Sequence, residues 1–481
     1  MIPAKDYLLV APELILLLAG LVVMMAEPLL PPGRSRGGLG LFSFIAVISA
    51  LAASFYQASL GVNQTGFFNM LRVDSFSIFF HILILAISAL VILSSIKYLE
   101  AQDIHSGEYY ALILMGTVGM VLMTSSVELV LIFVALEISS ISSYVLAGFR
   151  RKVAISTESS LKYFLLGSFA TAFFLYGVAL MFGSTGSTNV DEISRQITSG
   201  QPVALVFLAV ALMFVGIGFK VAAAPFHVWT PDVYEGSPIP VVALLSTGPK
   251  VAAFGVLLRV LFGASTPGWF WLVWISAALS MTIGNFGALR QTNVKRMLAY
   301  SSIAHAGYLL VAIAASGTAG ISAVIFYSAS YASMNLGAFT VIAHFAGADE
   351  RYVAIEDYAG LARTAPGMAA TLTIFLLSLI GIPATAGFFA KFYVFSASMH
   401  AHLVWLTLIG VVNSAVASYY YLRLVVVMYM HEPKYDHPLA GAPWPVVTVL
   451  TATAAITLYL GVLPGRVLGF ALQSAHDLIH H

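Results

Sequence analysis

Five ionisable residues lie inside long apolar segments of this 481-residue sequence: Glu137, Lys162, Lys220, Lys250 and Lys391. Placing one such side chain at the centre of a bilayer costs roughly 2.5–3.5 kcal/mol. Proteins keep these groups when they are paired or used, and amines and carboxylates at this depth can take up and release protons. The residue types and their positions therefore predict a proton-transfer pathway inside a membrane.

A long basic side chain can also reach the membrane surface from a buried backbone position. This interpretation stays open for Lys162, which follows a basic Arg-Arg-Lys run by ten residues. We expect it for Arg259 and Arg423, which lie near the ends of apolar segments, and we expect Glu13 and Asp74 at the interface as well. The three other lysines lie about half a span from the nearest polar loop, where proton transfer is the better interpretation.

The composition requires a lipid environment. Hydrophobic residues make up 60% of the chain and charged residues 9%, whereas a soluble domain carries about 25% charged residues. The formal net charge is +1, without a basic domain, so nothing favours nucleic-acid binding. The sequence has no cysteine, which excludes disulfides and cysteine-ligated iron–sulfur clusters or haem in this chain. Electron transfer through this chain itself is therefore not expected.

The apolar segments predict an all-α polytopic membrane protein with about fourteen transmembrane helices. The positive-inside rule orients them: twelve basic residues fall in the loops after odd-numbered helices, against four in the other loops and at the ends. Both termini are therefore expected on the outer side of the membrane. The predicted spans are 7–27, 38–58, 73–96, 109–126, 127–149, 159–183, 203–225, 239–262, 269–289, 297–316, 320–345, 367–398, 403–430 and 443–463.

Two predicted spans combine a lysine with a proline: Lys220 precedes Pro225, and Lys391 follows Pro383. Proline frees an upstream carbonyl, and at membrane depth a free carbonyl is tolerated only inside protein or beside a wet cavity. A broken helix beside a lysine is thus a suitable place for water and a proton-binding amine. A simple packing kink is the alternative, because proline is frequent in membrane helices.

These two spans occupy equivalent places in two predicted five-helix repeats, helices 4–8 and 9–13. Since five is odd, the second repeat is expected to run inverted through the membrane, as in transporters that bind ions near the midplane. The predicted division is residues 1–100 for helices 1–3, 101–265 and 266–432 for the repeats, and 433–481 for helix 14 and a C-terminal surface helix.

Three sequence blocks resemble a known family. They are the run from Gly216 to Arg259, the block Asn293–Tyr308 and the block Gly381–Phe392. Together they resemble the antiporter-like membrane subunits of bacterial NADH:quinone oxidoreductase (complex I), which are related to Mrp-type Na+/H+ antiporters. The block Pro231–Gly236, with the sequence Pro-Asp-Val-Tyr-Glu-Gly, is similar to the N type within that family.

The resemblance implies a role for each buried charge. Glu137 and Lys220 correspond to the family's charged pair, Lys250 to its connecting lysine, and Lys391 to its terminal proton donor toward the outer side. Lys162 is implied as an intermediate and His305 as a bridge between half-channels, although His305 can also simply hydrogen-bond across helices.

The resemblance also implies a translocase subunit of the bacterial cell (inner) membrane, coupled to quinone reduction elsewhere in the complex. NADH, FMN, iron–sulfur clusters and quinone would bind to partner subunits, and no cofactor to this chain. The expected partners are the antiporter-like M subunit and small K/J-type subunits. Two alternatives are a stand-alone Mrp-type Na+/H+ antiporter subunit and a passive scaffold, and the scaffold leaves the five buried charges unexplained.

Overall fold

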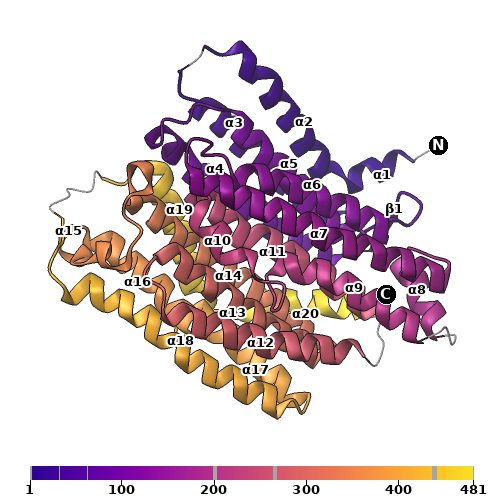
Figure 1. Cartoon of the computed structure of the whole chain (residues 1–481). Helices are drawn as coiled ribbons and strands as arrows, with labels where there is room; N and C mark the ends of the chain where they lie inside the picture. Colours follow the sequence, from indigo (N-terminus) through magenta and orange to yellow (C-terminus); the bar gives the residue numbers. More distant parts are fainter. Residues whose placement is uncertain are drawn as a thin grey trace.

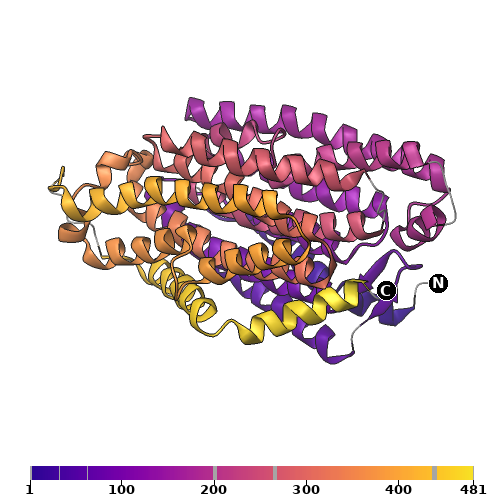
Figure 2. The ribbon, with the colours of Figure 1, turned by 90° about the horizontal axis from the view of Figure 1, so that it is seen from below.

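The computed structural model describes residues 3–31, 33–61, 63–198, 203–263, 268–435 and 441–479. These residues form helices that run side by side in an elongated bundle (Figures 1 and 2). The N-terminal part also contains a short antiparallel hairpin, β1 (Gln64–Gly66) with β2 (Leu71–Val73). Its helices are α1 (Ala4–Leu9), α2 (Ala11–Ala26), α3 (Gly37–Ser59), α4 (Ser75–Ala101) and α5 (Glu108–Ser125), with the 3-10 turn η1 (Glu27–Leu29).

The middle and C-terminal parts contain the helices that carry the predicted site. The first group is α6 (Leu129–Ala147), α7 (Ala154–Thr185), α8 (Val190–Thr198), α9 (Val203–Val221), α10 (Trp229–Gly236) and α11 (Ile239–Gly263). The second group is α12 (Trp269–Leu289), α13 (Val294–Ala315), α14 (Gly317–Ala346), η2 (Ala348–Glu350), η3 (Ile355–Tyr358), α15 (Leu361–Thr364), α16 (Pro366–Ile380), α17 (Ala386–His400) and α18 (Val404–Met430). The chain ends with α19 (Trp444–Val462) and α20 (Gly465–Ile479).

Twelve helices in the described ranges are long and apolar enough to cross a membrane, so the chain is a multi-span membrane protein. Two predicted spans look different. The segment 320–345 lies in α14, which has 30 residues but is rich in serine and tyrosine and is not among the twelve. The segment 367–398 is two shorter helices, α16 and α17, separated by a break.

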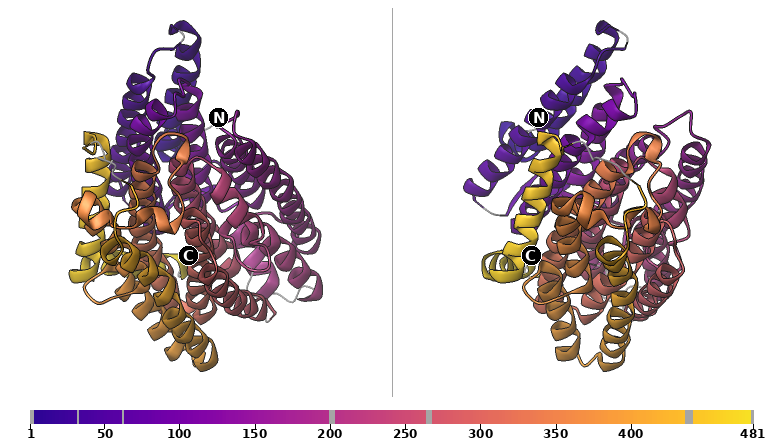
Figure 3. Two further views of the ribbon diagram at one scale, coloured as in Figure 1. Left: turned by 60° about the vertical axis from the view of Figure 1, so that its left-hand side comes forward. Right: turned by 90° about the vertical axis from the view of Figure 1, so that its left-hand side faces the viewer.

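The bundle has an enclosed centre and an apolar circumference. Helix α11 is buried along its whole apolar stretch, and α13 nearly so, whereas less than half of the apolar stretch is buried in α2, α3, α7 and α18. The N-terminal helices lie at one side of the bundle and α17 and α18 at the opposite side (Figures 1 and 3). Charged groups on α11 and α13 are therefore shielded from lipid by protein, as buried ionisable groups require.

Arg259 and Asp74, which were expected at the interface, are covered by protein rather than exposed on its surface. Both are buried, and the Arg259 guanidinium donates to Asp74 Oδ1 at 2.7 Å and to the Thr124 carbonyl at 2.9 Å. Asp74 also caps α4 by accepting from the Ser77 amide at 2.7 Å. The two charges neutralise each other inside the protein, so neither side chain has to reach water. Glu13 is buried by protein too.

Candidate functional site

Lys250 lies at the centre of the bundle, on α11 directly after Pro249. Its Nζ donates to Ser302 Oγ at 2.5 Å and to the Ser302 carbonyl at 3.3 Å. The Tyr331 hydroxyl on α14 donates to the same Ser302 Oγ at 2.7 Å. A cavity of about 10 Å³ adjoins Lys250, Ser302 and Tyr331, close to the space that one water molecule needs. The lysine therefore has one hydroxyl partner and room for one water, but no carboxylate partner among the described residues.

Lys220 is the penultimate residue of α9, where the first helix break begins. Its Nζ donates to Ser140 Oγ on α6 at 2.9 Å and lies 5.7 Å from the centre of the Tyr163 ring and 5.9 Å from that of Tyr144. Aromatic faces attract a cation through their quadrupole. The amine is thus held by one hydroxyl and two rings.

The break after Lys220 is stabilised by polar groups from its neighbours. Ala222 has a φ of +60°, and helix does not resume until α10. The Ala224 amide donates to Ser280 Oγ at 2.7 Å, and Ser276 Oγ donates to the Ala224 carbonyl at 2.6 Å. Trp229 Nε1 donates to the freed Phe219 carbonyl at 3.0 Å. These bonds satisfy the backbone groups that the break releases inside the membrane.

Glu137 lies on α6, three residues before the serine that binds Lys220. Residues three apart are neighbours on a helix surface, so its carboxylate belongs to the same region. In the described part of the chain, Glu137 Oε1 is buried without a hydrogen-bond partner, and no ion pair within 4.0 Å joins it to Lys220. The predicted charged pair is therefore close in space but not in contact.

Lys391 lies on α17, after the second break. Its three ammonium protons have three acceptors: the Ile380 carbonyl at 2.7 Å, Ser414 Oγ at 2.8 Å and the Leu379 carbonyl at 3.1 Å. These carbonyls are freed where α16 ends at Gly381, whose φ is +95°. The broken helix thus builds a site for the amine.

Replacing Gly381 with alanine is expected to destabilise this site. A φ of +95° is unfavourable for an L-residue, and the added Cβ would come within 3.1 Å of Lys391 Cδ. We expect a loss of about 1–2 kcal/mol, measured as a lower thermal stability of the purified assembly. Gly367→Ala is the matched control, because nothing lies within 4 Å of its Cβ position and it belongs to the same helix. Equal stability of the two variants would contradict this account of the break.

His305 lies on α13 between Lys250 and Lys391. Its Nδ1 hydrogen-bonds the Tyr327 hydroxyl at 2.7 Å, and its Nε2 the Tyr421 hydroxyl at 3.3 Å. It stands three residues after Ser302 and three before Tyr308, whose ring centre lies 5.0 Å from Lys391 Nζ. A three-residue step advances about 4.5 Å along the axis and leaves the two side chains adjacent, turned by about 60° around the helix. Ser302, His305 and Tyr308 therefore follow a strip that winds around α13 from the Lys250 contact to Lys391.

An aromatic layer lies between Lys220 and Lys250. The Tyr163 ring stacks on Trp229 with centroids 4.4 Å apart, Trp229 meets Tyr234 at 6.2 Å, and the Tyr234 ring lies 5.9 Å from Lys250 Nζ. The aromatic rings contact both Lys220 and Lys250. Among the described residues, no continuous chain of hydrogen bonds joins the two amines. A proton passing between them needs water.

Lys162 lies apart from the buried residues Lys220, Lys250 and Lys391. Its side chain is 42% exposed on α7 and forms ion pairs of 2.8 Å with Glu158 and with Asp232 of α10. Asp232 also binds Arg296 at 2.8 Å. Burial raises the pKa of Asp232, but its hydrogen bonds from Lys162 and Arg296 lower it more, so the pKa is below its ordinary value. Lys162 thus belongs to a partly exposed ionic cluster.

The residues that sequence reasoning missed are the hydroxyl groups that contact the lysines, His305 or Ser302. Serine and tyrosine are abundant in this chain, and only the packing shows which of them face an amine. A weak signal existed, because Ser302 lies one helical turn from His305 in a block already singled out. The missed residues are Ser140, Ser302, Ser414, Tyr327, Tyr331 and Tyr421.

Comparison with known proteins shows the family of the chain. Residues 126–417 match the family model described as NADH:quinone oxidoreductase/Mrp antiporter, transmembrane. The chain is 62% identical over 484 residues to a protein named NADH-quinone oxidoreductase subunit N 2 from Koribacter versatilis, covering 99% of this chain and 98% of that relative.

Two solved structures are also similar. A chain of respiratory complex I from Thermus thermophilus has 36% identity and a TM-score of 0.82, covering 95% of this chain and 98% of that one. A chain of the Mrp complex from Dietzia sp. shares the fold, with a TM-score of 0.86 at 21% identity over 98% of both chains. On the sequence blocks, the helix arrangement and these relatives together, the chain belongs to the NADH:quinone oxidoreductase/Mrp antiporter family of membrane subunits.

Proposed function

We propose that this chain translocates protons through Lys220, Lys250, His305 and Lys391 as an N-type membrane-arm subunit of NADH:quinone oxidoreductase. The predicted function class is confirmed by relatives that bear this name. The residue roles rest on one observation above all, the winding strip of α13 that joins the Lys250–Ser302 contact to Lys391 by way of His305.

Glu137 controls whether Lys220 keeps its proton. Two unit charges 4 Å apart interact by about 4 kcal/mol at an effective dielectric of 20. The carboxylate oxygen that lacks a partner leaves Glu137 free to approach the amine. When the carboxylate is near, Lys220 stays charged; when it withdraws, Lys220 releases its proton to water beside the aromatic layer.

Transfer then proceeds along α13. Lys250 receives a proton and passes it by way of Ser302 to His305, whose two ring nitrogens can accept on one side and donate on the other. Tyr327 and Tyr421 orient the imidazole for this exchange. Lys391 takes the proton at the second break and releases it toward the outer side of the membrane.

The finer architecture is part of the same proposal. We count α14 as a span because it has 30 residues, and α16 with α17 as one broken span, which gives fourteen spans and inverted repeats over 101–265 and 266–432. Arg150 and Lys295 bind one carboxylate and so mark one end of the bundle. By the positive-inside rule that end faces the cytoplasm, and both termini face outward from the bacterial inner membrane.

Partner subunits complete the NADH:quinone oxidoreductase. NADH, FMN, iron–sulfur clusters and quinone bind to them, in keeping with the absence of cysteine from this sequence. The antiporter-like M subunit and small K/J-type subunits pack against the apolar circumference, where α7 exposes Leu165 and Phe169. Lys162 acts as an intermediate at that edge, through its contact with Asp232.

Replacing Glu137 with glutamine tests the proposed control. Glutamine has the size of glutamate but lacks the negative charge that controls the protonation of Lys220. NADH-driven proton translocation by inside-out vesicles is therefore expected to fall about tenfold. The matched control is Glu432→Gln, which removes a 91% exposed carboxylate that lies 4.0 Å from Arg363 and outside the route. A Glu137→Gln complex that translocates at the parental rate would contradict the role. Sodium-dependent exchange by the isolated chain would instead favour the antiporter function.

A further inference from the structure

Glu350 is a buried carboxylate that the proton route does not use. It ends η2, the turn after α14, and its side chain is 5% exposed. Its Oε1 accepts from the Tyr98 hydroxyl at 2.5 Å and from the Ile239 amide at 2.8 Å. Its Oε2 pairs with Lys295 at 2.7 Å and Arg150 at 3.1 Å.

These four donors come from four separate elements. Tyr98 is near the end of α4, and Arg150 follows the end of α6. Ile239 is the first residue of α11, and Lys295 is the second residue of α13. Lys295 and Arg150 are also nearly inaccessible. One carboxylate therefore joins the ends of four helices from distant parts of the sequence.

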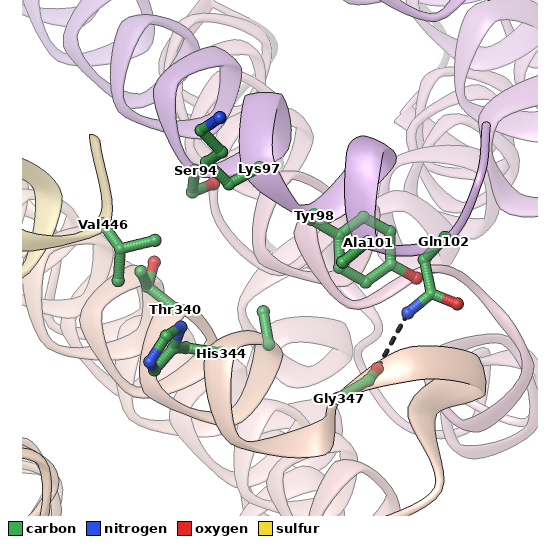
Figure 4. A pocket seen from close by; sticks show the side chains of 10 residues that line it. Ser94, Lys97, Tyr98, Ala101, Gln102, Thr340, His344, Gly347 and Val446 are labelled. Atoms are coloured by element: carbon green, nitrogen blue, oxygen red, sulfur yellow. Dashed lines mark hydrogen bonds between the residues drawn. The ribbon is translucent and has the colours of Figure 1, made fainter. Parts of the chain in front are cut away.

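The turn that presents Glu350 is itself fixed to α4. Gln102 Nε2 donates to the Gly347 carbonyl at 2.8 Å, which Figure 4 shows, and Gln102 Oε1 accepts from the Asp349 amide at 2.9 Å. Gly347, Asp349 and Glu350 all have positive φ, between +52° and +67°. A turn with two non-glycine residues in this region persists only where its surroundings hold it. The position of the Glu350 carboxylate is thus firmly determined.

The helices joined at Glu350 meet again at the site. Ser302 lies seven residues beyond Lys295 on α13, about 10 Å along the axis. Lys250 lies eleven residues beyond Ile239 on α11, about 16 Å along its axis. The two helices therefore touch through polar groups at two depths, once through Glu350 and once through the Lys250–Ser302 hydrogen bond.

We propose that Glu350 is a positioning residue that holds the starts of α11 and α13 together and thereby places Lys250 against Ser302. This rests on the proposed function, because the contact matters only if Lys250 carries protons. Arg150 extends the same junction to α6, which bears Glu137 and Ser140. Removing the carboxylate leaves two buried cations without their counter-ion, which pushes the joined helix ends apart.

The test is a double-mutant cycle in the assembled NADH:quinone oxidoreductase. Proton translocation by membrane vesicles is measured per assembled complex for Glu350→Gln, Ser302→Ala and the double variant. Glu350→Gln is expected to lower the rate about fivefold in the parental background and less than about twofold in the Ser302→Ala background, since the contact it positions is already lost. Equal losses in both backgrounds, or no loss in either, would overturn the proposal.

Two further variants secure the test. Asp349→Asn, which removes an exposed carboxylate from the same turn, is expected to leave the rate at the parental level. Should Glu350→Gln fail to assemble, Tyr98→Phe takes its place in the cycle, because it removes a single hydrogen bond to the carboxylate. Lys391→Met, measured alongside, distinguishes a failure of the proposed function from a failure of this inference. A parental rate in Lys391→Met would contradict the proposed function. An inactive Lys391→Met together with no coupling between Glu350 and Ser302 would contradict only the role of Glu350.

Discussion

Lys391→Met is expected to lower NADH-driven proton translocation about 100-fold. Methionine has a similar length but cannot hold a proton, so the second break loses its only amine among the described residues of that site. The Leu379 and Ile380 carbonyls also lose their donor. The measurement is proton uptake by inside-out vesicles, normalised to the amount of assembled complex.

Lys434→Met is the matched control for this prediction. Lys434 lies beyond α18, is 46% exposed and pairs with Asp357 at 3.6 Å, far from the broken helices in sequence and outside the route. Its replacement is expected to leave translocation unchanged. Comparable activity in the Lys391→Met and parental complexes would remove Lys391 from the route.

Lys250→Met is expected to cause a loss of the same order, about 100-fold, because the route along α13 begins at the Lys250–Ser302 contact. Tyr331 still donates to Ser302 in this variant, so the surrounding helices keep one of their polar contacts. If the two lysines act in series, Lys250→Met combined with Lys391→Met is no worse than either alone.

The control for Lys250 is Lys97→Met, which removes a 43% exposed lysine paired with Glu100. It is expected to translocate at the parental rate. Multiplicative losses in the Lys250/Lys391 double variant would indicate two independent routes instead of one.

The lysines could be predicted from the sequence because a charge inside an apolar segment costs free energy whether its side chain faces lipid or protein. Lys220, Lys250 and Lys391 are all buried, beside helix breaks or on the most enclosed helix. The same reasoning could not place Lys162, since its burial depends on which face α7 turns to its neighbours. The cost of a charge shows that a partner is needed, but not which residue provides it.

Long-range pairing explains why the partners of these charges could not be predicted. Arg259 and Asp74 are 185 residues apart in the sequence, and each looks interfacial on its own. Glu350 follows α14 in what reads as a polar loop, yet it binds residues from four other elements. Such contacts follow from how the helices pack, which hydropathy and spacing do not contain.

The hydroxyl groups of the site escaped prediction for a related reason. In the sequence, Ser140 and Ser302 look like ordinary packing residues, because small side chains such as serine favour close helix contact in membranes. Only their distances to Lys220 and Lys250 distinguish them. The helix breaks, in contrast, were readable because proline acts on the backbone of its own segment.

The central claim is that Lys391 works by exchanging a proton and not by holding a fixed positive charge. Arginine keeps the charge and the donors but does not lose its proton in proteins. Proton translocation per NADH oxidised should therefore be measured in vesicles that carry Lys391→Arg in the fully assembled complex. The account predicts a loss as deep as that of Lys391→Met, and translocation at the parental ratio and rate would contradict it.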